Sequence, residues 1–270
     1  MSRNKVLSDF YTNVCDEDNR LVNGNYSKVE FITTTKYIDK YLKPGSKILE
    51  VGAGTGRYSL HYAELGYEVN AIEFVSHNIK ILKSKIKKGM KITAEQGDAV
   101  DLSRFADNTF DVTLVLGPLY HLYNLEDQKK AISEAVRVTK PGGIVAIAYL
   151  TSDSIIIGWG LDGHLIDGQG VDFDNNFKII NTVEGVFAAF YIKEFKKLMK
   201  EFNVKYLKNV ATDGMSEHLK EKIDALSEEE FNVWLKYHLS TCEREDLQGY
   251  SNHMLYICKK NKGETKCKAE

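Results

Sequence analysis

The sequence predicts an α/β fold, with a doubly wound, mostly parallel sheet in residues 41–150. Two observations support this fold class. Short apolar runs rich in β-branched residues alternate with segments of helical periodicity, and prolines or glycines punctuate most of the runs. Strands that alternate with helices imply right-handed crossovers, which give a parallel sheet covered by helices on both faces.

The elements of this core follow one another in a regular order. Strands are expected at residues 47–51, 68–72, 91–96, 110–116 and 143–150. Helices fill the intervals at 56–65, 76–87 and 126–138. Gly66 is a plausible C-cap for the first of these helices, because glycine adopts the left-handed conformation at low cost.

The second half of the chain is expected to complete the sheet. Residues 151–186 are glycine-rich and loop-like, and 204–211 and 253–258 have strand patterns. Helices are expected at 191–202, 216–226 and 228–242, the last opened by a capping-box pattern, Ser227 to Glu230. The segment 213–249 is therefore predicted to be a helical cap inserted before the last strand.

Composition excludes several classes of protein. Lys and Arg total 36 against 38 Asp and Glu, so the basic excess typical of nucleic-acid-binding proteins is absent. The most apolar stretches, 112–116 and 144–150, are far shorter than the roughly 20 residues of a membrane span. The chain starts with a polar segment, and its cysteines (Cys15, Cys242, Cys258 and Cys267) form no CxxC pair. We therefore expect a cytoplasmic protein with free thiols and no membrane partner.

The strongest local signal is a glycine-rich loop. The strand at 47–51 runs into Gly52, Gly54 and Gly56, and a helix follows at once. Glycines allow a sharp turn and a close ligand approach, and the free N–H groups of a helix start favour an anion. The alternative is a tight turn with no ligand. Arg57 stands where the dinucleotide fingerprint requires its third glycine, which disfavours a nicotinamide oxidoreductase.

A carboxylate follows at the spacing that ribose binding requires. Glu73 ends the second strand, about twenty residues after the loop. In a doubly wound sheet this position lies beside the first loop, where a carboxylate can accept both ribose hydroxyls. A solvated charge at a strand end is the alternative interpretation.

Together these residues carry a family resemblance. Glu50-Val-Gly52-Ala-Gly54-Thr-Gly56 resembles motif I of the class I S-adenosylmethionine-dependent methyltransferases, and the similarity extends over about residues 45–150. The resemblance implies a Rossmann-like, seven-stranded sheet. It also implies that the three glycines hold the methionine part of S-adenosylmethionine, that Glu73 holds the ribose, and that Glu50 reaches the amino end directly or through water. The product would be S-adenosylhomocysteine.

Further blocks extend the resemblance. Gln96-Gly97-Asp98-Ala99 matches the adenine-binding block, which implies that Asp98 accepts from the adenine amino group and Ala99 supplies a backbone contact. Residues 137–143 resemble the turn into strand five. Leu116, at the end of the fourth strand, is also assigned to the cofactor. Residues 1–40 would form an N-terminal helical lid, in which Arg20 could pair the methionine carboxylate; a surface arginine is the alternative.

The loop after the fourth strand bears on the acceptor. Its sequence is Gly117-Pro-Leu-Tyr120-His121-Leu. It lacks the Asn/Asp/Ser-Pro-Pro-aromatic pattern of enzymes that methylate amino groups in nucleic acids, and it looks more like small-molecule methyltransferases of the ubiquinone-biosynthesis type. His121 could act as a base and Tyr120 could orient the acceptor; alternatively, both only pack.

These observations lead to one functional prediction with open alternatives. We expect in-line methyl transfer to a small organic acceptor by a monomer or homodimer. The acceptor would bind between Tyr120–His121, the loop around Trp159 and the cap. An RNA or protein methyltransferase and a non-catalytic cofactor-binding regulator remain alternatives. No metal site is expected, because His238 and Cys242 lack a third ligand, and His253 is interpreted as a core residue.

Overall fold

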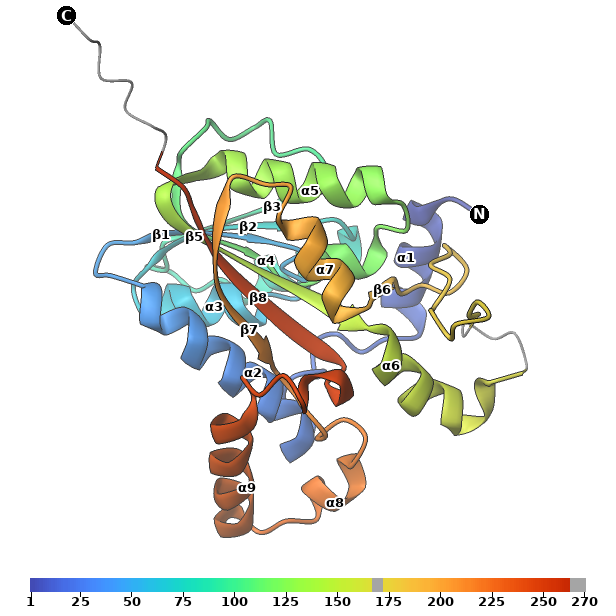
Figure 1. Cartoon of the computed structure of the whole chain (residues 1–270). Helices are drawn as coiled ribbons and strands as arrows, with labels where there is room; N and C mark the ends of the chain where they lie inside the picture. Colours follow the sequence, from blue (N-terminus) through green and yellow to red (C-terminus); the bar gives the residue numbers. More distant parts are fainter. Residues whose placement is uncertain (167–171, 263–270) are drawn as a thin grey trace, which may run out of the picture.

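The strands form one sheet with the order β3-β2-β1-β4-β5-β8-β7, in which β6 pairs with β5 alone. The computed structural model describes residues 1–166 and 172–262 (Figure 1). Strands β1 to β5 pair in parallel, and β8 is antiparallel to both β5 and β7. The predicted doubly wound, mostly parallel fold is confirmed. The strands are β1 (Lys47–Val51), β2 (Glu68–Glu73), β3 (Ile92–Gln96), β4 (Phe110–Val115), β5 (Thr139–Thr151), β6 (Ala189–Phe190), β7 (Val204–Ala211) and β8 (His253–Lys260).

Helices cover the sheet on both sides, with α5 on one face and α2 and α3 on the other (Figure 1). The central strands β1 and β4 are buried almost throughout, as expected of strands covered on both faces. No helix in the described part of the chain is long and apolar enough to span a membrane. The α-helices are α1 (Arg3–Asn13), α2 (Asn25–Ile38), α3 (Arg57–Glu64), α4 (Ser76–Lys85), α5 (Leu125–Val138), α6 (Ser152–Ile155), α7 (Ile192–Met199), α8 (Lys220–Asp224) and α9 (Glu228–Thr241). Shorter or irregular helical segments are η1 (Asp39–Tyr41), η2 (Pro118–His121), η3 (Ile156–His164) and η4 (Gln248–Tyr250).

The prediction of a loop at residues 151–186 is wrong for its first part. Residues 152–164 form α6 and η3, although Gly158 and Gly160 lower the intrinsic helix propensity. The Thr151 hydroxyl caps α6 by accepting from the Ser154 N–H at 3.3 Å, and Ile155 and Ile156 pack against a buried cluster that includes Tyr120. Capping and tertiary packing thus outweigh the glycines. The end of the glycine-rich stretch, residues 167–171, lies outside the described residues.

Two other sequence-based boundaries are also wrong. The helix expected at 216–226 is confined to Lys220–Asp224, because Gly214 has a positive φ of 55° and the Ser216 hydroxyl is held by the Trp234 indole at 3.0 Å. Strand β5 starts at Thr139 and so includes much of the expected turn, with a shift of its pairing register opposite β4.

The N-terminal segment packs against the segment between β7 and β8. Val29 of α2 lies in a buried cluster with Ile223 of α8 and Phe231 of α9. Helix α2 of the predicted lid therefore packs with α8 and α9 of the predicted cap, whereas α1 lies apart from them and contacts α4 (Figure 1).

The capping box of α9 gives a first testable prediction. The Ser227 hydroxyl accepts from the Glu230 N–H at 3.3 Å, and the Glu230 carboxylate accepts from the Ser227 N–H at 2.9 Å. Replacing Ser227 by alanine should lower the free energy of unfolding by about 0.5–2 kcal/mol, as measured by urea denaturation. Ser240→Ala, at an exposed site near the end of the same helix, is the control. Equal stability of the two variants would contradict the capping role.

Candidate functional site

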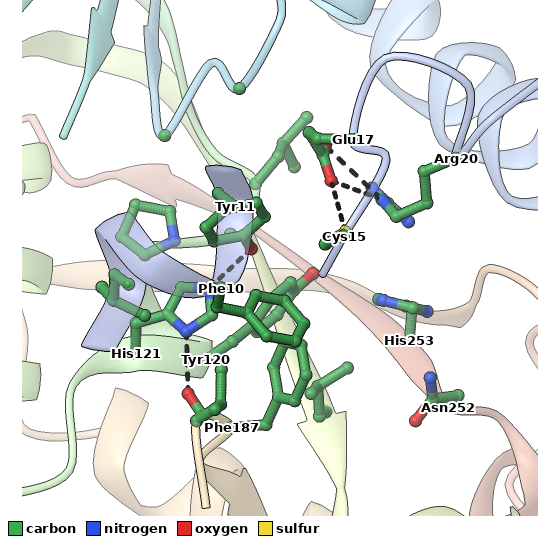
Figure 2. Close-up of a pocket in the computed structure, with 18 of the residues that line it drawn as sticks. Phe10, Tyr11, Cys15, Glu17, Arg20, Tyr120, His121, Phe187, Asn252 and His253 are labelled. Carbon is green, nitrogen blue, oxygen red and sulfur yellow. Dashed lines mark hydrogen bonds and ion pairs between the residues drawn. The ribbon is translucent and has the colours of Figure 1, made fainter. Parts of the chain in front are cut away.

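A cavity of about 1010 Å³ lies at the carboxyl ends of β1, β2 and β4. Its walls come from the core, from the N-terminal segment and from the segments that follow β5 and β7 (Figure 2). Most of the residues predicted from the sequence line it, namely Arg20, Gly52, Gly54, Glu73, Asp98, Ala99, Leu116, Tyr120 and His121. Glu50 and Gly56 lie outside its lining.

The glycine loop is shaped by positive φ angles of 79° at Gly52, 52° at Gly54 and 94° at Gly56. A Cβ on Gly52 would lie 2.5 Å from Pro118 Cδ, and one on Gly56 would collide with Leu82. Gly54 borders the cavity, where a Cβ would lie 3.0 Å from Glu17 Oε1. Packing of the protein therefore requires glycine at positions 52 and 56, whereas Gly54 borders the cavity beside the Glu17 side chain.

Glu73 is tied to the same loop. Its carboxylate accepts from the Gly54 N–H at 2.8 Å and from the Val75 N–H at 2.8 Å. Burial raises the pKa of Glu73 to about 7. A carboxylate has about four acceptor positions, so Glu73 keeps capacity to accept from a ligand in the cavity.

Glu50 and Gly56 support the loop from behind. Glu50 is fully buried and accepts a hydrogen bond from the Ser59 hydroxyl of α3. Burial raises the pKa of Glu50 to about 8. Gly56 stands directly before α3 and packs on α4. This arrangement disfavours a direct contact of Glu50 or Gly56 with a ligand in the cavity. A contact of Glu50 through water stays a prediction.

The N-terminal segment covers the cavity and contacts two predicted binding residues. The Arg3 guanidinium forms an ion pair with Asp98 and lies 4.5 Å from the centre of the Phe74 ring. Arg20 pairs with Glu17 at 3.2 Å and with Glu30 at 2.8 Å. Asp98 and Arg20 therefore already have partners within the chain, which a ligand would share or displace.

His121 is held at both ring nitrogens. Its Nδ1 lies 2.9 Å from the Val186 carbonyl oxygen, and its Nε2 lies 2.8 Å from the Tyr11 hydroxyl (Figure 2). Because a carbonyl only accepts, Nδ1 donates and Nε2 accepts from Tyr11. Burial lowers the pKa of His121 to about 4. This arrangement gives His121 the role of a link between α1 and η2, and its predicted action as a base would require Tyr11 to move away.

The interpretation of His253 as an internal core residue is wrong, because His253 lines the cavity. Its Nδ1 lies 2.8 Å from Asp213 Oδ2 and 3.6 Å from Glu30 Oε2. Although burial lowers it, the charges of Glu30 and Asp213 raise the pKa of His253 above its ordinary value. Asp213 is 40 residues away in sequence and Glu30 is more distant still, so no local pattern could have indicated this group.

The same cluster has the spacing of metal ligands but not the electrostatic surroundings of a metal site. Ligand-type atoms of Glu30, Asp213 and His253 lie within 4.8 Å of one another. However, the Arg20 guanidinium occupies the neighbourhood of Glu30, and a fixed positive charge there opposes a divalent cation. We therefore treat the cluster as a proton-binding group. His238 and Cys242 do not join it: Cys242 lies 3.3 Å from the Tyr37 hydroxyl.

Fold and cavity together define the class of this protein as a Rossmann-like domain with a cavity at the carboxyl ends of its strands, the position where open α/β sheets bind their ligands. A family model described as "Methyltransferase domain" matches residues 49–147. Residues 49–147 therefore carry a methyltransferase domain, and for this core the predicted resemblance to the class I S-adenosylmethionine-dependent methyltransferases is confirmed.

The curated relatives match only part of this chain. A demethylmenaquinone methyltransferase of Renibacterium salmoninarum is 42% identical over 106 residues, 39% of this chain and 41% of that protein. Another, of Lysinibacillus sphaericus, is 36% identical over 166 residues, 60% of this chain and 64% of that protein. The matches thus span between two fifths and two thirds of these relatives. Magnesium protoporphyrin IX methyltransferase from Synechocystis PCC 6803, solved with S-adenosylhomocysteine, has a similar fold, with a TM-score of 0.59 at 12% identity over 96% of this chain and all of that one.

Proposed function

We propose that the chain transfers the methyl group of S-adenosylmethionine to a small organic acceptor. One observation carries the proposal: a single cavity connects the glycine loop and Glu73 with Tyr120 and His253. The cofactor would occupy the first end and the acceptor the second. The walls of the cavity include the N-terminal segment and the segment after β7, which suits a small acceptor better than a macromolecule.

The residues at the first end fit the cofactor. Glu73 has free acceptor capacity for ribose hydroxyls, and the methionine part would lie against Gly54 once the Glu17 side chain moves aside. Asp98 and Ala99 line the cavity and would bind adenine once Arg3 shares or releases Asp98. When bound, the cofactor supplies a methyl group on a positively charged sulfur, and the sulfur is the leaving group when a nucleophile attacks the methyl carbon in line.

The contribution of the protein would be positioning and exclusion of water. Bringing two reactants into alignment can supply much of the reduction in barrier. Tyr120 and Leu116 line the cavity beyond the glycine loop. Tyr120 would orient the acceptor, and Leu116 would contact the cofactor. The segments 1–40 and 213–249, proposed here as lid and cap, would close over both ligands. We place this activity in the cytoplasm, in a monomer or homodimer.

The names of the relatives do not establish the acceptor of this chain, so the acceptor has to be identified by experiments on this protein. The relatives are named for demethylmenaquinone, but Glu30, Asp213 and His253 all lie outside residues 49–147, the part of the chain that the methyltransferase-domain family model matches. A hydroquinone is therefore the first compound to test and not an established substrate.

Two measurements test the proposal. Calorimetry should show binding of S-adenosylhomocysteine and none of NAD. Labelled S-adenosylmethionine should then label at least one member of a panel of small acceptors: 1,4-naphthalenediol, catechol, benzylamine, N,N-dimethylbenzylamine and thioanisole. Binding without transfer to any of them would favour the regulatory alternative, and label in added RNA or protein would favour a macromolecular acceptor.

A further inference from the structure

We propose that His253, oriented by Asp213, accepts the proton that the acceptor loses during methyl transfer. The acceptor would then be a molecule with a proton to lose at the methylated group, such as a phenol, a hydroquinone or an amine with an N–H bond. This inference rests on the proposed function and extends it by naming the chemical class of the acceptor.

The hydrogen bond between His253 and Asp213 fixes the tautomer of the imidazole. Asp213 Oδ2 lies 2.8 Å from Nδ1 of His253, and an ionised carboxylate can only accept, so Nδ1 carries the hydrogen. In the neutral ring, the lone pair is then on Nε2. No hydrogen bond to Nε2 is found within the described residues, and the residue lines the cavity. A base with this orientation can take a proton from a ligand.

Asp213 is itself held in place. It is buried, and it accepts from the Ser251 hydroxyl at 2.5 Å and from the backbone N–H of His253 at 3.1 Å. Although burial raises it, the hydrogen bonds and charge of His253 leave the pKa of Asp213 below its ordinary value. Asp213 therefore stays ionised and keeps the imidazole oriented.

The surroundings of His253 favour its protonated form, which is the form that proton transfer creates. Glu30 Oε2 lies 3.6 Å from Nδ1, and Glu217 adds a further carboxyl group at the cavity wall. Arg20, which pairs with Glu30, opposes this effect. The ring of Tyr120 lies 5.6 Å from the imidazole. Its hydroxyl is uncharged at neutral pH, since a phenol loses its proton only at about pH 10 and burial raises the pKa of Tyr120 further.

His253 is better placed for this role than His121. The ring of Tyr120 lies 6.2 Å from His121 and 5.6 Å from His253, so both histidines border the same part of the cavity. Figure 2 shows them on different sides of it, with His121 bonded at both nitrogens and His253 beside Asn252. Only one of the two therefore has a nitrogen that can accept a proton without a change in the protein.

The step balances with the groups named. A lone pair of the acceptor forms the bond to the methyl carbon, while the carbon–sulfur bond breaks and leaves its electron pair on the sulfur of S-adenosylhomocysteine. The acceptor's proton moves to Nε2 of His253, and the imidazolium later returns it to solvent. An acceptor with no such proton, for example a tertiary amine, would not need His253.

The test compares His253→Asn with His238→Asn. Asparagine at 253 can still donate to Asp213 but has no basic nitrogen. His238 is a buried histidine on α9 outside the cavity lining, so its replacement controls for the general effect of losing an imidazole. With catechol or benzylamine as acceptor, His253→Asn should lower kcat about 100- to 10,000-fold, while the Kd for S-adenosylhomocysteine stays at the wild-type value. Transfer to N,N-dimethylbenzylamine, if it occurs, should be unaffected.

A second readout does not need an acceptor. NMR of the S-adenosylhomocysteine complex should show the Nδ1–H tautomer of His253 and a pKa above the ordinary value of about 6.5. Asp213→Asn should lower that pKa and move the acid limb of the pH–rate profile in the same direction. His238→Asn should change neither.

Several results would overturn the inference. They are an unchanged rate in His253→Asn, an equal loss of transfer to benzylamine and N,N-dimethylbenzylamine, an Nε2–H tautomer, a pKa at or below the ordinary value, or a requirement for added Mg²⁺ or Zn²⁺. Failure of the proposed function would look different, because S-adenosylhomocysteine would then not bind the wild-type protein. If the cofactor binds but no compound in the panel is methylated, the NMR titration decides whether the Asp213–His253 pair exists.

Discussion

Replacing Gly54 by valine is expected to abolish binding of S-adenosylhomocysteine in a protein that still folds. Gly54 has a φ of 52°, where a β-branched residue is strained, and its Cα borders the cavity. The new side chain would approach Glu17 and fill space needed by the methionine part of the ligand. We expect calorimetry to show at least about a hundredfold loss of affinity, equivalent to about 2.8 kcal/mol.

Gly66→Val is the matched control for this change. Gly66 also has a positive φ, 88°, but a Cβ there would meet no atom within 4 Å, and the residue lies away from the cavity. It therefore carries the backbone strain without the steric block. Full affinity in Gly54→Val, or an equal loss in both variants, would mean that the loop is only a turn.

Replacing Glu73 by alanine should weaken binding of S-adenosylhomocysteine about 10- to 100-fold. Loss of a hydrogen bond to a charged group typically costs about 1.5–3 kcal/mol. In addition, the backbone N–H groups of Gly54 and Val75 lose their acceptor, so the loop itself becomes less fixed. Glu73→Gln keeps the shape and one acceptor oxygen and should be intermediate. An unchanged Kd in a folded alanine variant would disprove the ribose assignment.

The pH dependence of binding gives an independent test of the same residue. The pKa of Glu73 is raised to about 7 by burial, so its carboxyl group is partly protonated at neutral pH. Ribose hydroxyls donate to the ionised form, and binding should therefore strengthen as the pH rises through 7 and weaken below it. The Kd should rise toward tenfold for each unit of pH below about 6. Calorimetry between about pH 5.5 and 8.5 measures this slope, and Glu73→Gln should remove the part of it that comes from Glu73.

The end of the cavity that we propose for the cofactor was largely predictable, because its signals are local. A strand, a sharp turn and a helix start follow one another within about ten residues. Each of the three glycines indicates a position with unusual backbone angles, and each has a positive φ in the structure. The position of Glu73 follows from β2 pairing in parallel with β1, which the alternation of strands and helices already implied. Local sequence thus determined the fold of the core and the residues placed along its edge.

The end of the cavity that we propose for the acceptor depended on contacts that no local pattern contains. Asp213 and His253 meet because β7 and β8 are antiparallel neighbours, and Glu30 reaches them only because α2 packs against α8 and α9. The hydroxyl of Tyr11 forms a hydrogen bond with His121, which is 110 residues away in sequence, and Arg3 forms an ion pair with Asp98, which is 95 residues away. Helix formation at 152–164 likewise depended on packing that outweighs the low propensity of its glycines. Hydrogen bonding and charge at a site are set by which side chains the fold brings together, and over such separations only the tertiary structure decides that.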